Sequence, residues 1–278
     1  MSKTHTTVAI VYDFDGTLAK GNIQENSFIP NLGLTTERFW KEVKEITKEN
    51  EMDEILAYMY LLIKKANEKG VSCKKKKIKE HGKSVQYFEG VEQYFARINQ
   101  YAKEKCINLE HYIISSGTKE MIEGTSIAKE FKCIFASSFK YDHEGVPEWP
   151  ALAINYTTKT QYLFRINKGI HNAWDNSSIN EYTPPADRPI LFENMIYIGD
   201  GATDIPAMKM LNYQGGTSIA VYPSKTKGAK EKAQKLLQND RANYIAKTDY
   251  SENSDIVNII QGILDQIAAK ENIRQYTK

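Results

Sequence analysis

One feature constrains the fold more than any other: the apolar run Val8–Tyr12 is followed at once by Asp13-Phe14-Asp15-Gly16. An apolar run of this length that ends near a glycine is typical of a strand buried inside a parallel sheet. Side chains two residues apart on a strand point the same way, so Asp13 and Asp15 should project together at the carboxyl end of the strand, where open α/β sheets bind ligands. Two carboxylates this close repel each other unless a cation lies beside them, and a divalent metal is the usual one.

Three further segments carry polar residues at comparable places. The apolar run Glu110–Ile114 leads into Ser115-Ser116-Gly117-Thr118, and the run Met195–Gly199 leads into Asp200-Gly201-Ala202-Thr203-Asp204. Between them, Thr157–Thr160 opens a stretch with helical periodicity and contains Lys159. A carboxylate pair, a serine, a lysine and a second carboxylate pair, each at a strand end or a helix start, are the groups that a phosphoryl-transfer site needs.

The order and local chemistry of these four segments resemble the haloacid dehalogenase (HAD) superfamily, and within it the phosphoserine-phosphatase-like branch. The sequence DFDGT at residues 13–17 resembles motif I, Ser115 motif II, Lys159 motif III, and GDGATD at residues 199–204 motif IV. The resemblance covers residues 7–20 and 90–222. It implies an α/β fold with a Rossmann-like, three-layer core and a parallel sheet. It also implies a Mg²⁺-dependent phosphatase that hydrolyses a small phosphomonoester through an aspartyl-phosphate intermediate.

The same resemblance assigns roles to the four aspartates. Asp13 would be the nucleophile that attacks phosphorus, and Asp15 would be the general acid and base. Mg²⁺ would be bound by Asp13, by the backbone carbonyl of Asp15 and by Asp200, while Asp204 would bind it through water or orient the other ligands. The competing interpretation, in which these aspartates only cap turns and helices, suits Asp204 or Asp15 taken singly.

Phosphate binding is assigned to motifs II and III. Ser115 would donate a hydrogen bond to the transferring phosphoryl group and Lys159 would contribute charge, while Ser116 and Gly117 would add backbone N–H groups at a helix start. Ser116 is an alternative to Ser115, which could itself be a simple N-cap, and Lys168 is an alternative to Lys159.

A helical insert is expected after the first strand. Apolar residues recur at helical spacing over residues 35–48 and 52–69, and residues 22–88 show no convincing strand. Members of the superfamily carry a helical cap of the first type at this place. We therefore expect a catalytic core over residues 1–20 and 89–278, and a cap over residues 21–88. In the core, the patterns predict helices over 91–105, 227–239 and 255–268, strands over 131–136 and 217–221, and a hairpin over 140–146.

Substrate specificity is expected to lie in the cap and just after motif I. Four polar residues there could hydrogen-bond a leaving group, and Glu25 could meet an amine: Asn22, Gln24, Glu25 and Asn26. The alternative is that these residues are polar groups at a helix start that face water. Similarly, Phe39 and Trp40 suit the cap core or a platform for stacking.

Composition limits the partners and the compartment. The chain has 278 residues, a net charge of +2 and 41% hydrophobic residues, as in an ordinary globular protein. Residues 1–7 are polar and the apolar run that follows is short, so neither a signal peptide nor a membrane span is expected. Cys73, Cys106 and Cys133 show no metal-binding spacing and are expected to be reduced thiols of a cytoplasmic protein.

Three alternatives to the phosphatase remain at this point: a phosphotransferase on the same core, a nucleic-acid end phosphatase, and a non-catalytic phosphate-binding protein. The lysine run 74–77, with Lys79, is the footprint that a nucleic-acid enzyme would show. It lacks interleaved aromatic residues, however, and is better explained as a solvated helix face, so a nucleic-acid partner is not expected. The long polar segment 169–194 departs from simpler relatives and is expected to be a surface loop, a flap or a dimer contact. The sequence leaves the oligomeric state open.

Overall fold

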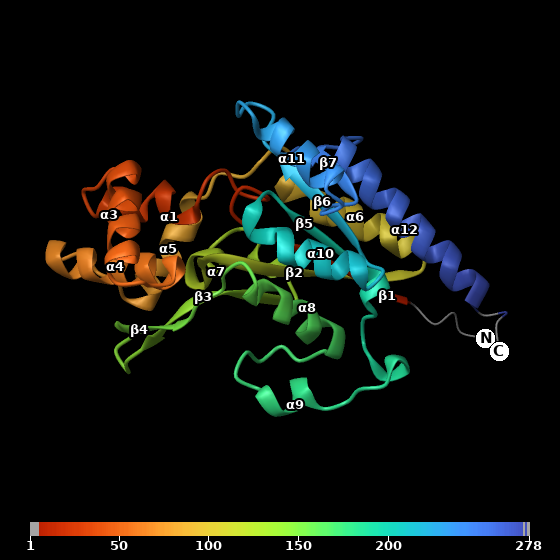
Figure 1. Ribbon diagram of the computed structural model, residues 1–278, viewed down its shortest axis with the longest axis horizontal. Helices are drawn as coiled ribbons and strands as arrows, with labels where there is room; N and C mark the ends of the chain where they lie inside the picture. Colours follow the sequence, from red (N-terminus) through yellow and green to blue (C-terminus); the bar gives the residue numbers. More distant parts are fainter. Residues whose placement is uncertain (1–5, 275, 277–278) are drawn as a thin grey trace.

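The computed structural model describes residues 6–274 and residue 276. A seven-stranded sheet in the order β4-β3-β2-β1-β5-β6-β7 runs through the centre of the molecule (Figure 1). Neighbouring strands are parallel except for β3 and β4, which form an antiparallel hairpin. The expected α/β class with a largely parallel sheet is confirmed. The strands are β1 (Thr6–Tyr12), β2 (Ile107–Thr118), β3 (Cys133–Tyr141), β4 (Pro147–Leu152), β5 (Met195–Gly199), β6 (Thr217–Tyr222) and β7 (Tyr244–Lys247).

Alternation along β1 explains how the sheet is covered on both faces. Val8 and Ile10 pack in one apolar cluster with residues of α6 (Val91–Glu104) and α12 (Asp255–Arg274). Ala9 and Val11 pack in a second cluster with α8 (Thr158–Lys168) and α10 (Ile205–Tyr213). Successive side chains of a strand point to opposite faces, so a strand buried on both faces is apolar throughout, as β1 is.

The segment between β1 and α6 is helical, as expected. Its elements are α1 (Ile23–Asn26), α2 (Phe28–Asn31), α3 (Thr36–Glu49), α4 (Glu54–Lys69), α5 (Lys75–His81) and the 3₁₀ turn η1 (Gly82–Ser84). Asp53 begins α4, because its carboxylate accepts hydrogen bonds from the N–H groups of Ile55 and Leu56 at 2.9 and 3.1 Å. Apolar residues of this segment, such as Phe39 and Leu62, belong to the same cluster as Val8. Because the helical segment and the sheet share one apolar cluster, this packing does not separate them, and the division into a cap over 21–88 and a core stays a prediction.

Several elements differ from their predicted bounds. The strand expected over 131–136 extends as β3 to Tyr141, where the predicted hairpin turns through Gly145. The short edge strand β7 and the helix α10 were not predicted. The other helices are α7 (Lys119–Glu123), α9 (Asn176–Asn180) and α11 (Ala229–Gln238), with 3₁₀ turns η2 (Ala128–Glu130), η3 (Pro185–Asp187), η4 (Phe192–Asn194) and η5 (Ala202–Asp204).

The segment 169–194 is ordered by α8. The buried Arg165 donates hydrogen bonds to the carbonyl groups of Asn172 and Ala173 at 2.7 and 3.0 Å. Lys168 donates to the carbonyl groups of Ile179 and Glu181. This segment, which includes α9, is thus fastened to the core through its backbone.

The remaining expectations concern the lysine run, the cysteines, membrane-spanning helices and a signal peptide. The lysines at 74–77 and Lys79 are exposed on and next to α5, as a solvated helix face requires. The three cysteines are free. No helix within the described residues is both long and apolar enough to cross a bilayer. Residues 1–5, on which part of the expectation of no signal peptide rests, lie outside the described residues.

Candidate active site

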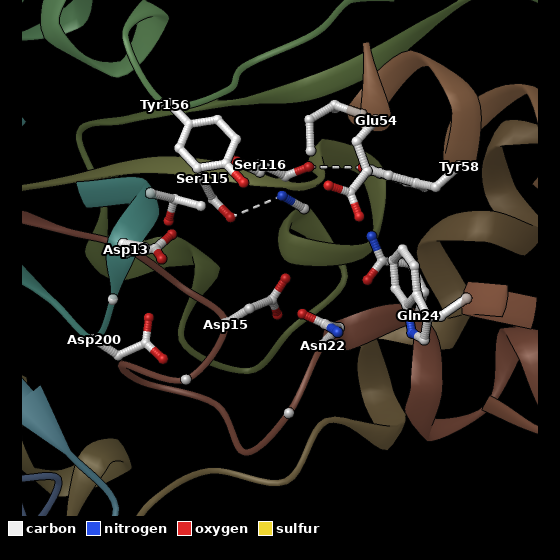
Figure 2. A pocket seen from close by; sticks show the side chains of 18 of the residues that line it. Asp13, Asp15, Asn22, Gln24, Glu54, Tyr58, Ser115, Ser116, Tyr156 and Asp200 are labelled. Carbon is white, nitrogen blue, oxygen red and sulfur yellow. Dashed lines mark hydrogen bonds between the residues drawn. The ribbon is translucent and has the colours of Figure 1, made fainter. Parts of the chain in front are cut away.

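The predicted motifs meet at the carboxyl ends of the central strands. Asp13 follows β1, Ser115 lies near the end of β2, and Asp200 follows β5, while Lys159 comes from the first turn of α8. Parallel neighbours place these ends at one edge of the sheet. Asp13, Ser115 and Asp200 at these strand ends line a cavity of about 620 Å³ between the sheet and the helical segment (Figure 2).

A buried lysine joins two of the aspartates. Lys159 Nζ lies 3.1 Å from Asp13 Oδ1 and 2.7 Å from Asp204 Oδ1, and all three side chains are almost inaccessible to solvent. Burial alone lowers the pKa of a lysine, but the charges of Asp13 and Asp204 raise the pKa of Lys159 above its ordinary value. Lys159 is therefore a fixed cation beside the proposed nucleophile.

Asp13 is the carboxylate that faces the cavity from β1. Burial raises its pKa to about 6, while the charge of Lys159 acts in the opposite direction. The N–H group of Phe14 donates to Asp13 Oδ1 at 2.8 Å and orients the carboxylate. Asp13 is therefore mostly ionised near neutral pH and is held in place, as a nucleophile must be.

Asp204 is committed to contacts inside the protein. Besides Lys159, the hydroxyl of Tyr197 donates to Asp204 Oδ1 at 2.7 Å, and the N–H group of Gly201 donates to Oδ2 at 3.2 Å. Both carboxylate oxygens thus have partners. This geometry suits the second of the two roles expected for Asp204, that of orienting the other groups of the site.

Asp200 sits at the mouth of the cavity and is exposed, yet protein atoms crowd its carboxyl group. This crowding, together with the charges of Asp13 and Asp204, raises the pKa of Asp200 to about 8. Carboxylate oxygens of Asp13, Asp200 and Asp204 all lie within 4.8 Å of one another. Carboxylate oxygens are ligands that suit Mg²⁺, and because both oxygens of Asp204 already have partners, Asp13 and Asp200 are the two carboxylates of this group that could bind the ion directly.

Gly16 makes room for Asp200. Its φ of +74° is a left-handed conformation, and a Cβ at this position would lie 2.2 Å from Asp200 Oδ2. A side chain here would push away the carboxylate that faces the proposed metal site. Position 16 of motif I therefore requires glycine for a steric reason, the closeness of Asp200, as well as for the conformation of its backbone.

Substituting Gly16 tests this packing. Gly16→Ala should weaken Mg²⁺ binding at least about tenfold, because Asp200 must move to admit the methyl group. The measurement is the Mg²⁺ concentration that gives half of the metal-induced rise in melting temperature. Gly33→Ala is the matched control: Gly33 has a φ of +69°, but a Cβ added there would meet no atom within 4 Å, so the variant carries a backbone cost of about 1 kcal/mol without the clash. Equal Mg²⁺ affinity in both variants would contradict the steric role.

Asp15 is placed beside the cavity by the loop after β1. Its Oδ1 accepts a hydrogen bond from the N–H group of Ile23 at 2.8 Å. Burial first, and the charge of Asp13 second, raise the pKa of Asp15 well above its ordinary value. A carboxyl group whose pKa is raised in this way is suited to act as a general acid.

The motif II residues correct one expectation. Ser116 and Gly117 do not lie at a helix start: β2 continues to Thr118, with a register shift between Ser115 and Thr118, and α7 begins at Lys119. The N–H group of Gly117 donates to Ser115 Oγ at 3.0 Å. Both serines line the cavity, and Ser116 Oγ is buried without a partner among the described residues. The strand end, with its local irregularity, presents these groups.

The polar residues after motif I fall into two groups. Asn22 and Gln24 line the cavity, whereas Glu25 and Asn26 are not among its lining residues. Glu25 Oε1 accepts hydrogen bonds from Trp40 Nε1 at 2.6 Å and from Asn22 Nδ2 at 2.7 Å. Its Oε2 accepts from the N–H group of Asn22, the N-cap residue of α1, at 3.3 Å. Its carboxylate is already engaged, which favours the helix-start alternative over contact with an amine.

The far wall of the cavity was largely missed in the sequence. Glu54 and Tyr58 of α4 face the motif residues across the cavity, and Tyr156, which precedes α8, lines it next to Ser115 (Figure 2). Of the two aromatic residues considered for the cap, Phe39 is buried, while Trp40 is partly buried and also lines the cavity. No local motif marks these positions, because they meet only through packing. A tryptophan at a partly exposed helix position was the one available signal. Gly21, Lys44 and Ile55 also line the cavity outside the motifs, and Gly201, Ala202 and Thr203 line it within motif IV.

Comparisons with known proteins agree with this geometry. Residues 10–209 match the model of the family described as haloacid dehalogenase-like hydrolase. An uncharacterized protein of Borreliella burgdorferi is 28% identical over 287 aligned residues, which cover 94% of this chain and 97% of the relative.

Solved structures share the fold at low sequence identity. A probable phosphoserine phosphatase from Vibrio cholerae superposes with a TM-score of 0.59 at 13% identity, over 96% of this chain and 67% of the other. A phosphoserine phosphatase in its apo form gives 0.55 at 17% identity, over 92% and 98%. A HAD family hydrolase from Salmonella enterica gives 0.55 at 17% identity, over 88% and 68%.

Proposed function

The chain belongs to the haloacid dehalogenase-like hydrolases, and we propose that it is a Mg²⁺-dependent phosphatase that hydrolyses a small phosphomonoester with Asp13 as nucleophile. The observation that carries the proposal is the buried Lys159, which contacts Asp13 directly, while Asp13, Ser115 and Asp200 line the cavity. A fixed cation beside a carboxylate nucleophile is suited to bring a phosphate dianion to that nucleophile.

The chain's own residues account for both chemical steps. A carboxylate oxygen of Asp13 attacks phosphorus and forms a bond to it, while the bond from phosphorus to the leaving oxygen breaks and Asp15 gives its proton to that oxygen. Asp15, now ionised, takes a proton from a water molecule that attacks the phosphorus of the aspartyl-phosphate. Phosphate leaves and Asp13 is regenerated as a carboxylate. Ser115 and Lys159 hold the phosphoryl oxygens during both steps.

The acidic cluster would hold the metal. Asp13 and Asp200 would be its side-chain ligands, the backbone carbonyl of Asp15 would be a third, and Asp204 would orient this set through Lys159 and Tyr197. Bound Mg²⁺ would neutralise negative charge, so that an anionic substrate approaches Asp13.

The carboxyl groups of the proposed metal site should make the stability of the metal-free protein depend on pH in a defined direction. The pKa values of Asp13 (about 6) and Asp200 (about 8) exceed the ordinary 3.8, so without metal the folded state binds protons more tightly than the unfolded state. The stability of the metal-free protein should therefore fall as pH rises from about 4 to 8. Mg²⁺ should relieve this loss, and should raise the melting temperature by roughly 2–4 °C more at pH 8 than at pH 5.

Thermal unfolding with Mg²⁺ or a chelator at the two pH values tests this expectation. Asp200→Asn, which removes one carboxylate of the cluster, should reduce both the pH dependence and the response to Mg²⁺. A response to Mg²⁺ that is the same at pH 5 and pH 8 would show that these carboxylates are not the ligands.

The substrate should be a small molecule in the cytoplasm, for which the free cysteines and a cavity of about 620 Å³, a volume that suits a small molecule, provide support. Phosphate release from a panel of phosphomonoesters, with and without Mg²⁺, tests the function. The panel contains phosphorylated amino acids, amino alcohols, sugars and nucleotides, and a 3′-phosphorylated oligonucleotide. Hydrolysis of small members supports the proposal, and hydrolysis of the oligonucleotide alone favours a nucleic-acid end phosphatase. Turnover that requires an added alcohol favours a phosphotransferase, and no turnover under any condition favours a phosphate-binding protein.

A further inference from the structure

Two residues of the helical segment form hydrogen bonds to the two segments that supply the proposed phosphate ligands. The first is Tyr58, whose hydroxyl donates a hydrogen bond to the carbonyl oxygen of Ser116 at 2.7 Å (Figure 2). Tyr58 is 2% exposed, so this bond is shielded from water. Ser116 directly follows Ser115, and the contact fixes the backbone at the point where the proposed phosphate ligand projects.

The second contact joins Asp53 and Asn155. One carboxylate oxygen of Asp53 caps α4, and the other accepts a hydrogen bond from Asn155 Nδ2. The carbonyl oxygen of Asn155 in turn accepts from the N–H group of Lys159 at 3.0 Å, and the N–H group of Asn155 donates to Thr158 Oγ1 at 2.7 Å. Asn155 therefore sets the start of the helix that carries Lys159.

Both contacts come from the first turns of one helix. Asp53 and Tyr58 lie at the amino-terminal end of α4, and their partners belong to the two segments that supply Ser115 and Lys159. Neither Asp53 nor Tyr58 is a phosphate ligand, since each polar group is already engaged with protein. Their shared position ties the spacing of the two phosphate ligands to the position of α4.

We propose that Asp53 and Tyr58 are positioning residues: α4 holds the Ser115 and Lys159 segments at the spacing that binds the phosphoryl group, so that phosphate affinity depends on the contact of this helix with the core. The inference rests on the proposed function, because it concerns the same phosphate ligands. According to this proposal, α4 contributes to phosphate binding, in addition to forming one wall of the cavity.

The test measures binding of inorganic phosphate to the Mg²⁺-loaded protein by calorimetry, and turnover with several leaving groups. Tyr58→Phe removes the hydroxyl alone and should weaken phosphate binding about three- to tenfold, the effect of losing one hydrogen bond. The value of kcat/KM should fall by a similar factor for every leaving group. Tyr60→Phe is the matched control, because Tyr60 lies on the same helix and is 47% exposed.

A charge exchange tests the second contact. Asn155→Asp places two carboxylates side by side, and Asp53→Asn places two amide donors there while keeping a good helix cap. Each single variant should weaken phosphate binding about three- to tenfold, and the double variant D53N/N155D, in which an amide again donates to a carboxylate, should restore it to within about twofold.

The outcomes separate this inference from the proposed function. Unchanged phosphate affinity in Tyr58→Phe and in both single variants, or a double variant no better than the singles, would overturn the positioning role. So would a loss of activity that depends on the leaving group, since α4 would then only shape the cavity. Calorimetry needs no turnover, so a protein that binds phosphate in this α4-dependent way but shows no Asp13-dependent turnover would retain the inference and refute the phosphatase.

Discussion

Replacing Asp13 with asparagine should lower kcat by at least about 10⁴-fold while the protein stays folded. The amide is close in size to the carboxylate but cannot form the bond to phosphorus. Because burial raises the pKa of Asp13 to about 6, its ionised form is disfavoured in the folded protein, and removing the charge should not lower stability in the absence of metal. Phosphate release and thermal unfolding, both measured on the purified variant, check the two parts.

The matched control for this variant is Asp187→Asn. Asp187 is exposed in η3, and the same chemical change there should leave kcat within about twofold of wild type. Substantial Asp13→Asn activity, for instance one tenth of the wild-type rate, would exclude Asp13 as the nucleophile.

Replacing Lys159 with methionine should remove both activity and much of the stability. The substitution leaves the buried carboxylates of Asp13 and Asp204 without their cation, and breaking a buried ion pair in this way costs about 3–5 kcal/mol. The free energy of unfolding, measured with urea in the presence of a chelator, should fall by this amount near pH 7.5. Turnover should fall at least about 100-fold, as for the loss of other groups that stabilise a transition-state charge.

The pH dependence of the stability of Lys159→Met shows whether the unpaired carboxylate charges cause its loss of stability. The charge of Lys159 lowers the pKa of Asp13, so without Lys159 this pKa should rise further above its ordinary value. The folded state then binds protons more tightly than the unfolded state, and stability should recover as pH falls from 8 towards 5. Lys230→Met, a substitution of an exposed lysine on α11, should show neither the loss nor the recovery. A Lys159→Met protein as stable as wild type at pH 7.5 would refute the buried ion-pair account.

The strand ends of the site could be predicted because each is encoded in a few consecutive residues. An apolar run followed by Asp13, Ser115 or Asp200 specifies both a buried strand and the polar group at its end. Lys159 could be placed because its neighbours begin a helix with a clear apolar face. In each case the information is local, and the parallel sheet then brings the ends together.

Other features depend on packing that the sequence does not show. The edge strand β7 has only three consecutive apolar residues, Tyr244–Ala246, a run too short to predict a strand, and only Ala246 among them is buried. Ser116 and Gly117 were expected at a helix start, but the irregular end of β2 continues through them. Glu54 and Tyr58 lie on a helix whose apolar pattern predicts which residues are buried. The same pattern does not predict which of its polar side chains face the cavity.

The most direct test of the central claim is to look for the phosphoryl group on Asp13. Asp15→Asn should slow hydrolysis of the intermediate, because no base activates the attacking water. An aryl phosphate, whose leaving group needs no proton from residue 15, should still form the intermediate in this variant. Acid quenching during its turnover, followed by peptide mass spectrometry, should find one phosphoryl group on the peptide that contains Asp13. It should be absent when Asp13 is also replaced by asparagine. Phosphate release with no phosphoryl group ever detected on this peptide, or with the group on another residue, would contradict the account.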